Sequence, residues 1–135
     1  DREDVKQSLQ IILQVTKDVK EGKNYVIFPE GTRSKRGNIV GEFKGGSFKA
    51  ATKAKCPIVP VALIDCFKPF DTKSTKPVTV QVHILKPLLY EEYKDMKTVE
   101  IAEEVRKRIV EKIDEKIQEK NKKTIIYIFM CFVVN

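Results

Sequence analysis

Amphipathic helical patterns and short apolar runs follow one another along this chain, and that alternation limits the folds open to it. Apolar residues spaced three and four apart mark one helical face at about residues 4–20 and another at about residues 98–117. Short apolar runs at residues 25–28, 57–64 and 78–85 lie between them. Helices that alternate with short strands are typical of an α/β domain. The sequence therefore predicts an α/β fold with a mostly parallel central sheet flanked by helices.

The apolar runs predict strands of two kinds. Residues 25–28 (YVIF) and 57–64 (PIVPVALI) are continuously apolar, which is typical of buried strands. Pro60 indicates an edge, a bulge or a functional bend, because proline cannot donate to a strand ladder. Residues 78–85 (VTVQVHIL) alternate apolar and polar side chains. They predict a half-buried strand with its valines and isoleucine inward and His83 as an ordinary strand residue.

The charge balance favours an anionic partner. The 135 residues, about the size of one domain, carry 26 Lys and Arg against 19 Asp and Glu, a net charge of +7. Phosphorylated small molecules, an anionic bilayer surface and nucleic acid all suit such a chain, and charge alone does not choose among them. The three cysteines contain no CxxC pair, so they predict a reduced, intracellular chain without a disulfide framework or a metal site.

The segment with the most chemistry is residues 29–34 (PEGTRS), directly after the first predicted strand. In α/β sheets, ligands bind beyond the carboxyl ends of strands. Gly31 lets a ligand approach the main chain, and the segment also offers two hydroxyls. The guanidinium of Arg33 suits a phosphate or carboxylate, and Glu30 could orient it or accept a hydrogen bond from a substrate hydroxyl. Spacing alone leaves both an anion site and a plain surface turn open.

The run VIFPEGTRS at residues 26–34 resembles the third signature block of the glycerolipid (lysophospholipid) acyltransferase family, whose best-known members make phosphatidic acid from lysophosphatidic acid. FKGG at residues 43–46 is similar to the helix start that follows in the family, and PIVPVAL at residues 57–63 to its fourth block. The Asp-Arg pair at residues 1–2 resembles the end of the second block. The resemblance covers nearly everything from residue 1 to about residue 120, and it implies a glycerol-3-phosphate acyltransferase-like fold, here partial.

The resemblance implies transfer of a fatty acyl group from acyl-CoA or acyl carrier protein to a lysophosphatidate-type acceptor in phospholipid biosynthesis. The resemblance also implies that Arg33 contacts the acceptor phosphate, with Arg2 as a second cationic contact. The residues that it places around the same acceptor are Glu30, Gly31, Thr32 and Ser34. Pro60 is expected on the acyl-donor side. No metal and no cofactor are expected, because the thioester is already activated.

The family's catalytic motif, His-x-x-x-x-Asp, does not occur in the printed sequence. In the family, this His takes the proton of the attacking hydroxyl and the Asp holds the imidazole. The only histidine here is His83, and no Asp follows it at that spacing. We therefore expect a C-terminal part of an acyltransferase, cut inside the second block and inactive by itself, with no catalytic residue in this chain. A non-catalytic phosphate- or phospholipid-binding module is the alternative.

The expected acyltransferase domain spans residues 1–120, and a basic-then-apolar tail follows at residues 121–135. The tail's ten apolar residues, 125–134, are about half of the roughly 20 that a membrane-spanning helix needs. A strand, an interfacial anchor and out-of-context sequence therefore stay open.

Four lysines near the middle of the chain could meet coenzyme A phosphates or anionic lipid heads, or form a solvated face: Lys44, Lys49, Lys53 and Lys55. No nucleic-acid motif surrounds them, so nucleic acid is not an expected partner. The expected partners are the glycerophospholipid acceptor, the acyl donor and an anionic membrane surface. The expected location is the cytoplasmic side of a membrane, peripheral or anchored by segments outside this sequence.

Overall fold

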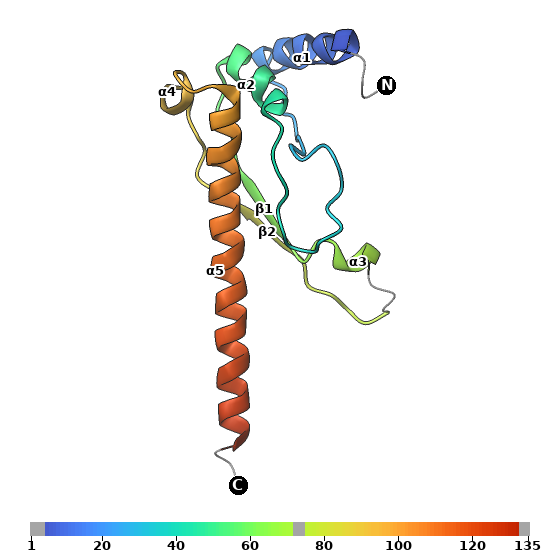
Figure 1. Ribbon diagram of the computed structural model, residues 1–135, viewed down its shortest axis with the longest axis vertical. Helices are drawn as coiled ribbons and strands as arrows, with labels where there is room; N and C mark the ends of the chain where they lie inside the picture. The colour runs from blue at the N-terminus through green and yellow to red at the C-terminus, as the bar shows by residue number, and fades with distance from the viewer. Residues whose placement is uncertain (1–4, 72–74, 133–135) are drawn as a thin grey trace.

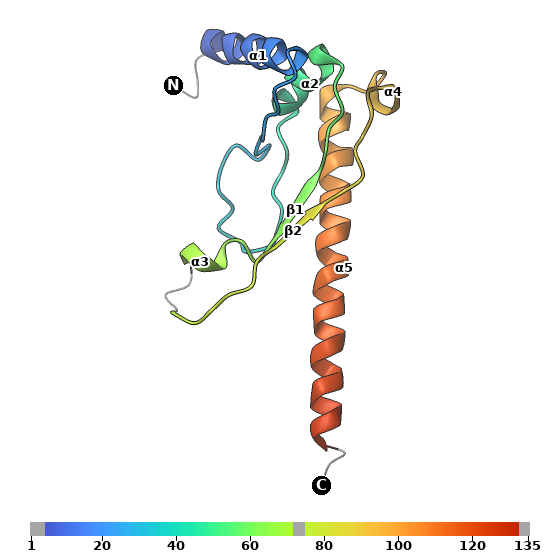
Figure 2. The same cartoon turned by 180° about the vertical axis from the view of Figure 1, so that it is seen from behind.

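A computed structural model of the chain describes residues 5–71 and 75–132, with side chains described for residues 7–71 and 75–121. Its elements in chain order are α1 (Val5–Lys20), the 3-10 helix η1 (Gly45–Phe48), α2 (Lys49–Ala54), β1 (Val61–Ile64), α3 (Lys68–Asp71), β2 (Gln81–Ile84), α4 (Tyr90–Tyr93) and α5 (Thr98–Phe132). Figures 1 and 2 show α1, α2 and α4 near the N-terminal end of α5, with β1 and β2 alongside that long helix. The C-terminal part of α5 extends away from the other elements (Figure 1).

The core lies between α5 and the inner face of β1. The buried residues of the predicted α5 stripe are Ala102, Val105, Ile109 and Ile113, and Ile117 packs partly buried beside them. Ala62 and Ile64 point toward this stripe from β1, whose side chains alternate between exposed and buried. Burying a large aliphatic side chain contributes roughly 1.5–3 kcal/mol. The helical stripe predicted from spacing is therefore confirmed, and it provides much of the core.

The helix start that FKGG at residues 43–46 resembles is also present, as η1 followed by α2. A Cβ atom on Gly45 would lie 3.2 Å from the backbone of Thr98 and Val99, so a side chain here would push η1 away from the start of α5. This close approach lets Phe48 of η1 enter the core. The first glycine of FKGG thus has a packing reason within this chain.

The described strands form a two-stranded antiparallel sheet. Val61 pairs with Ile84 and Ile64 pairs with Gln81, and an isolated bridge joins Ile58 to Leu88. Pro60 lies buried just before β1, where its carbonyl accepts a hydrogen bond from the Leu85 amide at 2.9 Å. The pair does not test the mostly parallel central sheet, which would need further strands and stays a prediction.

The predicted buried strand at residues 25–28 is wrong in this structure. The segment is irregular, and 86% of Val26 and 69% of Phe28 are exposed. An apolar run becomes a strand only where a neighbouring strand offers backbone partners and a covering layer. Within the described residues, neither stands beside this segment. Its anchor is instead the Tyr25 hydroxyl, which donates a hydrogen bond to the buried Asp18 of α1.

The predicted strand at residues 78–85 is present as the shorter β2, but its buried face is the other one. Val82 is 60% exposed and Ile84 75% exposed, whereas Gln81 and His83 are half-buried. The pairing with β1 fixes which side chains face α5, and a register one residue away would exchange the two faces. His83 is an ordinary strand residue, as predicted, with its ring Nε2 3.0 Å from the Gln81 amide oxygen.

Helix α1 matches the prediction almost to the residue, and Gly22 follows its end with a φ of +90°. At the other end of the chain, α5 continues to Phe132, so the alternative that the tail is a strand is wrong for its described part. The predicted domain limit after residue 120 falls inside this helix. Among residues 5–71 and 75–132, no helix has an apolar stretch of membrane-spanning length. Cys56 and Cys66 are both free and half-buried.

Candidate functional site

The loop of residues 29–44 begins with a tight turn. The Gly31 amide donates to the Phe28 carbonyl at 3.1 Å, and Gly31 has a φ of +68°, a conformation that glycine adopts at low cost. The Lys44 amide then donates to the Pro29 carbonyl at 2.9 Å and closes the base of the loop. A Cβ atom on Gly31 would lie 3.1 Å from the Lys44 ammonium. The turn therefore has the cation of Lys44 beside it, in addition to Arg33 within the loop.

The far side of the loop is held by two other elements. Arg106 of α5 donates to the carbonyls of Gly41 and Val40 at 2.7 and 3.0 Å. Asn38 forms a reciprocal pair with Asp65: its amide group donates to the Asp65 carboxylate at 3.0 Å and accepts from the Asp65 backbone at 2.8 Å. The loop is therefore fixed by the sheet end and by α5, independently of the side chain of Arg33.

A pocket of about 500 Å³ lies between this loop, β1, α3 and α5. Its polar lining includes Glu30, Arg33, Ser34 and Asn38. Its apolar lining includes Phe28, Phe67 and Phe70, together with Ile39, Val40, Leu63, Cys66 and Ile113. The site thus joins an apolar hollow to a cation, an arrangement that suits a ligand with an anionic head and an apolar chain.

Arg33 lies at this pocket with its side chain 61% exposed. One of its terminal nitrogens, Nη2, donates to Oδ1 of Asp71 at 2.6 Å. The guanidinium carbon also lies 5.6 Å from the ring centroid of Phe70, within the range of a cation–π contact. Both contacts come from α3, which the sequence did not connect with Arg33.

The remaining predicted site residues are spread out. Glu30 lines the pocket and lies against Gly41. Gly31 and Thr32 belong to the same loop but not to the pocket lining. Pro60 is buried beside the core and is not part of this lining either. Arg2 lies outside the described residues, so its predicted phosphate contact stays a prediction.

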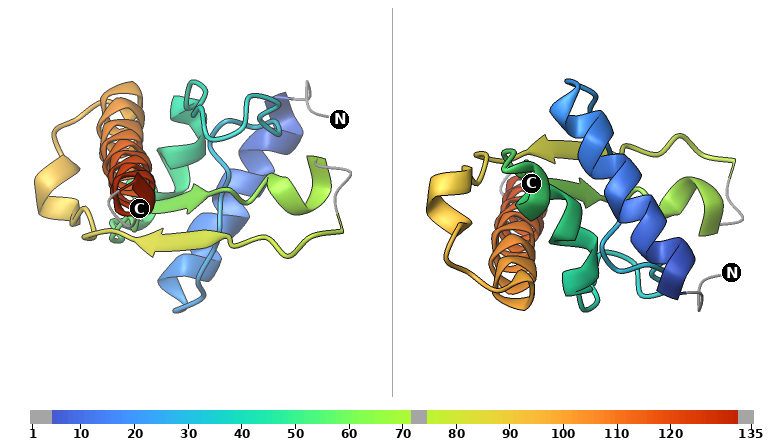
Figure 3. Two further views of the ribbon diagram at one scale, coloured as in Figure 1. Left: turned by 90° about the horizontal axis from the view of Figure 1, so that it is seen from below. Right: turned by 90° about the horizontal axis from the view of Figure 1, so that it is seen from above.

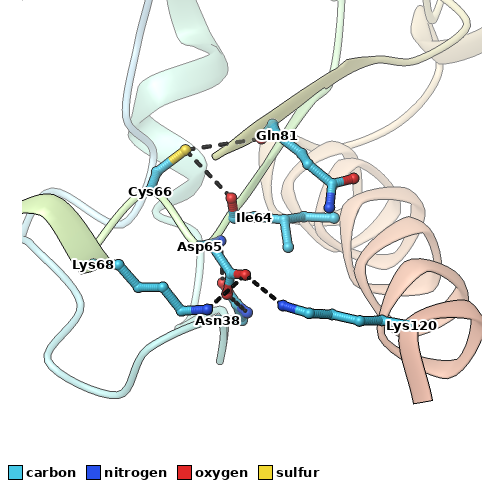
Figure 4. Close-up of polar contacts among 7 residues, drawn as sticks. All are labelled: Asn38, Ile64, Asp65, Cys66, Lys68, Gln81 and Lys120. Atoms are coloured by element: carbon cyan, nitrogen blue, oxygen red, sulfur yellow. Dashed lines mark hydrogen bonds and ion pairs between the residues drawn. The ribbon is translucent and has the colours of Figure 1, made fainter. Parts of the chain in front are cut away.

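Figure 4 shows a polar cluster at the end of β1 that sequence reasoning missed. Asp65 is 6% exposed, and its carboxylate accepts from Lys68 at 2.8 Å and from Lys120 of α5 at 3.1 Å, besides Asn38. Burial raises the pKa of Asp65, but the hydrogen bonds from these three side chains outweigh it and lower the pKa to about 2. Asp65 directly follows a strand, just as PEGTRS follows the first predicted strand, so the rule that placed the loop could also have found it.

None of the four lysines near the middle of the chain (Lys44, Lys49, Lys53 and Lys55) is part of the lining of this pocket. Lys49 and Lys53 line a separate hollow of about 480 Å³ together with Leu9 and Ile12 of α1. The Lys55 ammonium lies 5.7 Å from the Tyr90 ring centroid.

Comparison with known proteins identifies relatives of this chain. The sequence model of the acyltransferase family matches residues 1–64, which include all of the PEGTRS segment. A relative from Brassica napus, 1-acyl-sn-glycerol-3-phosphate acyltransferase BAT2, chloroplastic, is 42% identical over 73 residues, which cover 52% of this chain and 21% of the relative. The chain belongs to the acyltransferase family. The family is one of enzymes that transfer acyl groups.

Two further relatives are named for the same activity. The 1-acyl-sn-glycerol-3-phosphate acyltransferase alpha of Mus musculus is 35% identical over 65 residues, covering 46% of this chain and 22% of the relative. The 1-acyl-sn-glycerol-3-phosphate acyltransferase of Cocos nucifera is 30% identical over 100 residues, covering 72% of this chain and 32% of the relative. The chain thus spans a third or less of each of these relatives. No solved structure matches it.

Proposed function

We propose that this member of the acyltransferase family forms the acceptor-binding part of an enzyme that acylates a lysophosphatidate-type lipid in phospholipid biosynthesis. The observation that carries the proposal is the position of Arg33, a cation at a pocket lined by three phenylalanines. A lysophosphatidate has the complementary shape of a charged phosphate joined to an apolar chain. The relatives named as 1-acyl-sn-glycerol-3-phosphate acyltransferases support the same acceptor class.

In this proposal, Arg33 binds the acceptor phosphate through its guanidinium N–H groups, which form charge-assisted hydrogen bonds. Glu30, in the same pocket, belongs to the polar network around the acceptor head. The acyl donor is acyl-CoA or acyl carrier protein, and no cofactor or metal takes part because a thioester needs no further activation. The enzyme works at an anionic membrane surface, where its lipid acceptor resides. Pro60 and Arg2 keep their proposed places on the acyl-donor side and at the phosphate.

The second candidate function is a non-catalytic phosphate- or phospholipid-binding module. It is favoured by one observation, the lack of a His-x-x-x-x-Asp motif in the printed sequence. The two candidates make different claims about the reading frame directly upstream of residue 1. An upstream His-x-x-x-x-Asp motif before an apolar block supports the enzyme, and a natural chain that starts at residue 1 supports the module. By itself, the 135-residue chain should show no robust acyl transfer from acyl-CoA.

Binding measurements test the acceptor site directly. The 135-residue chain is titrated calorimetrically with 1-hexanoyl-sn-glycerol 3-phosphate, a short acceptor, and with 1-hexanoylglycerol, which lacks the phosphate. The chain should prefer the phosphorylated lipid, and Arg33→Ala should weaken its binding about tenfold or more, because hydrogen bonds between charged groups contribute about 1.5–3 kcal/mol. Lys35→Ala is the matched control, since it removes one exposed charge from the same loop outside the pocket lining. Equal binding of both lipids, or equal effects of the two substitutions, would remove Arg33 from the site.

A further inference from the structure

Arg33 is already paired with an anion of this chain, the carboxylate of Asp71. We propose that Asp71 is a built-in competitor of the acceptor phosphate: it occupies Arg33 in the unliganded chain and must be displaced before the acceptor binds. The inference rests on the proposed function, because it assigns Asp71 a role at the same acceptor site. It makes Asp71 a residue that sets the affinity of this site for phosphorylated acceptors.

The geometry of the pair allows such an exchange. Asp71 contacts Arg33 through a single hydrogen bond of 2.6 Å, although the guanidinium has five N–H groups. The two side chains are 61% and 38% exposed, and ion pairs between exposed side chains are weak and open easily. A phosphate can approach from solvent and offer Arg33 two oxygens in place of one.

The backbone of Asp71 stays in place when its side chain is displaced. Its amide donates to the Phe67 carbonyl at 3.0 Å, and Lys68 at the start of α3 pairs with Asp65, just after β1, at 2.8 Å. The Asp71 carboxylate therefore stays close to any phosphate on Arg33. A bound phosphate monoester carries close to two negative charges, so it is repelled by this neighbour.

Two effects of Asp71 on binding oppose each other. The carboxylate holds the guanidinium at the pocket, which favours binding, and it competes with and repels the phosphate, which opposes binding. The first effect is partly duplicated, because the Phe70 ring at 5.6 Å also holds the guanidinium. The second effect acts between full charges, and a phosphate monoester carries close to two of them, so it persists although water screens the partly exposed Asp71. Competition therefore outweighs positioning.

The test compares five variants of the 135-residue chain, Arg33→Ala alone among them, with the unmodified chain, using 1-hexanoyl-sn-glycerol 3-phosphate as the probe. Asp71→Asn keeps the size of the side chain and removes its charge, so it should bind the probe about twofold to fivefold more tightly. Asp71→Glu keeps the charge and should bind nearly as the unmodified chain does. Asp95→Asn is the matched control: it makes the same change at an exposed acid just after α4, which Figure 3 shows far from α3. Arg33→Ala combined with Asp71→Asn should bind as weakly as Arg33→Ala alone.

The outcomes separate this inference from the proposed function. Tighter binding by Asp71→Asn alone, abolished by Arg33→Ala, supports the competitor role. If Asp71→Asn binds no more tightly than Asp95→Asn while Arg33→Ala still weakens binding, the competitor role is wrong and the acceptor site stands. If Asp71→Asn tightens binding equally when Arg33 is absent, the effect is one of general charge and the inference is also wrong. A chain without preference for the phosphorylated lipid overturns both proposals.

Discussion

Replacing Asp65 by Asn isolates the charge at the centre of the cluster in Figure 4. Asp65 has a φ of +61°, and Asn tolerates this left-handed conformation about as well as Asp does, so the backbone preference is kept. The amide nitrogen of the new side chain must face either the Asn38 amide group or the ammonium groups of Lys68 and Lys120, because each currently donates to the carboxylate. The substitution therefore removes one charge and places two donors against each other.

The expected loss follows from the pKa of Asp65, which is lowered from 3.8 to about 2. A shift of this size corresponds to about 2.5 kcal/mol, and solvent around the two lysines reduces it to about 1–2 kcal/mol. Since the pKa in the folded chain lies below the unfolded value, this stability is present above about pH 4. It is lost as the pH falls from about 4 through 2, and below pH 2 the carboxylate is protonated in both states.

Urea unfolding followed by circular dichroism measures the effect at several pH values. At pH 7 the free energy of unfolding should be about 1–2 kcal/mol lower for Asp65→Asn than for the unmodified chain, and at pH 2 most of this difference should vanish. Asp95→Asn, at an exposed acid, serves as the control and should change stability by less than about 0.5 kcal/mol at either pH. A difference that keeps its size down to pH 2 would refute the reasoning, because it could not come from the Asp65 charge. Equal stability at pH 7 would show that the cluster contributes nothing to folding.

Two further predictions concern the core. Ile101→Ala removes a fully buried side chain of α5 and should lower the free energy of unfolding by about 2–5 kcal/mol. The control Val99→Ala, at a side chain that is 59% exposed, should change it by less than about 0.5 kcal/mol. Urea unfolding at pH 7 compares the two variants, and equal effects would contradict this core. Burial raises the pKa of Tyr93 to about 12, so the chain should lose stability as the pH rises above 10. Tyr93→Phe should reduce that alkaline loss of stability. It also leaves the Cys56 carbonyl without its hydroxyl donor, so the free energy of unfolding at pH 7 should fall by about 1–3 kcal/mol. An alkaline loss that is unchanged in Tyr93→Phe would show that another group causes it.

The parts of the fold that sequence predicted well are those set by local spacing. The stripes of α1 and α5 recur every three or four residues, and such a stripe forms a helix face whichever neighbours cover it. The strand predictions depended on neighbours instead. The apolar run at residues 25–28 has no described strand beside it, and β2 turns its polar residues toward α5 because its register with β1 requires it.

The site shows the same division between local and distant information. Glu30 and Arg33 were predicted from one short segment, and both line the same pocket. Asp71 and Asp65 were missed because they contact the loop across 38 and 27 residues of sequence, and no spacing rule connects such positions. Only Asp65 left a usable signal, its place directly after an apolar strand.

The loop separates the groups that hold it from the group proposed to bind the ligand. Arg106 and the Asn38–Asp65 pair fix its backbone, whereas the polar contact described for Arg33 is with the exposed Asp71 of α3. Substitutions in the first set should therefore lower both stability and acceptor binding, and Arg33→Ala should lower binding alone. Such a division explains how a binding arginine can be largely exposed and still well placed. Arg106 and the Asn38–Asp65 pair order the loop before the ligand arrives, so little further ordering is needed on binding. A loss of stability on Arg33→Ala as large as that on Asp65→Asn would contradict this separation, because Arg33 would then be one of the groups that hold the loop.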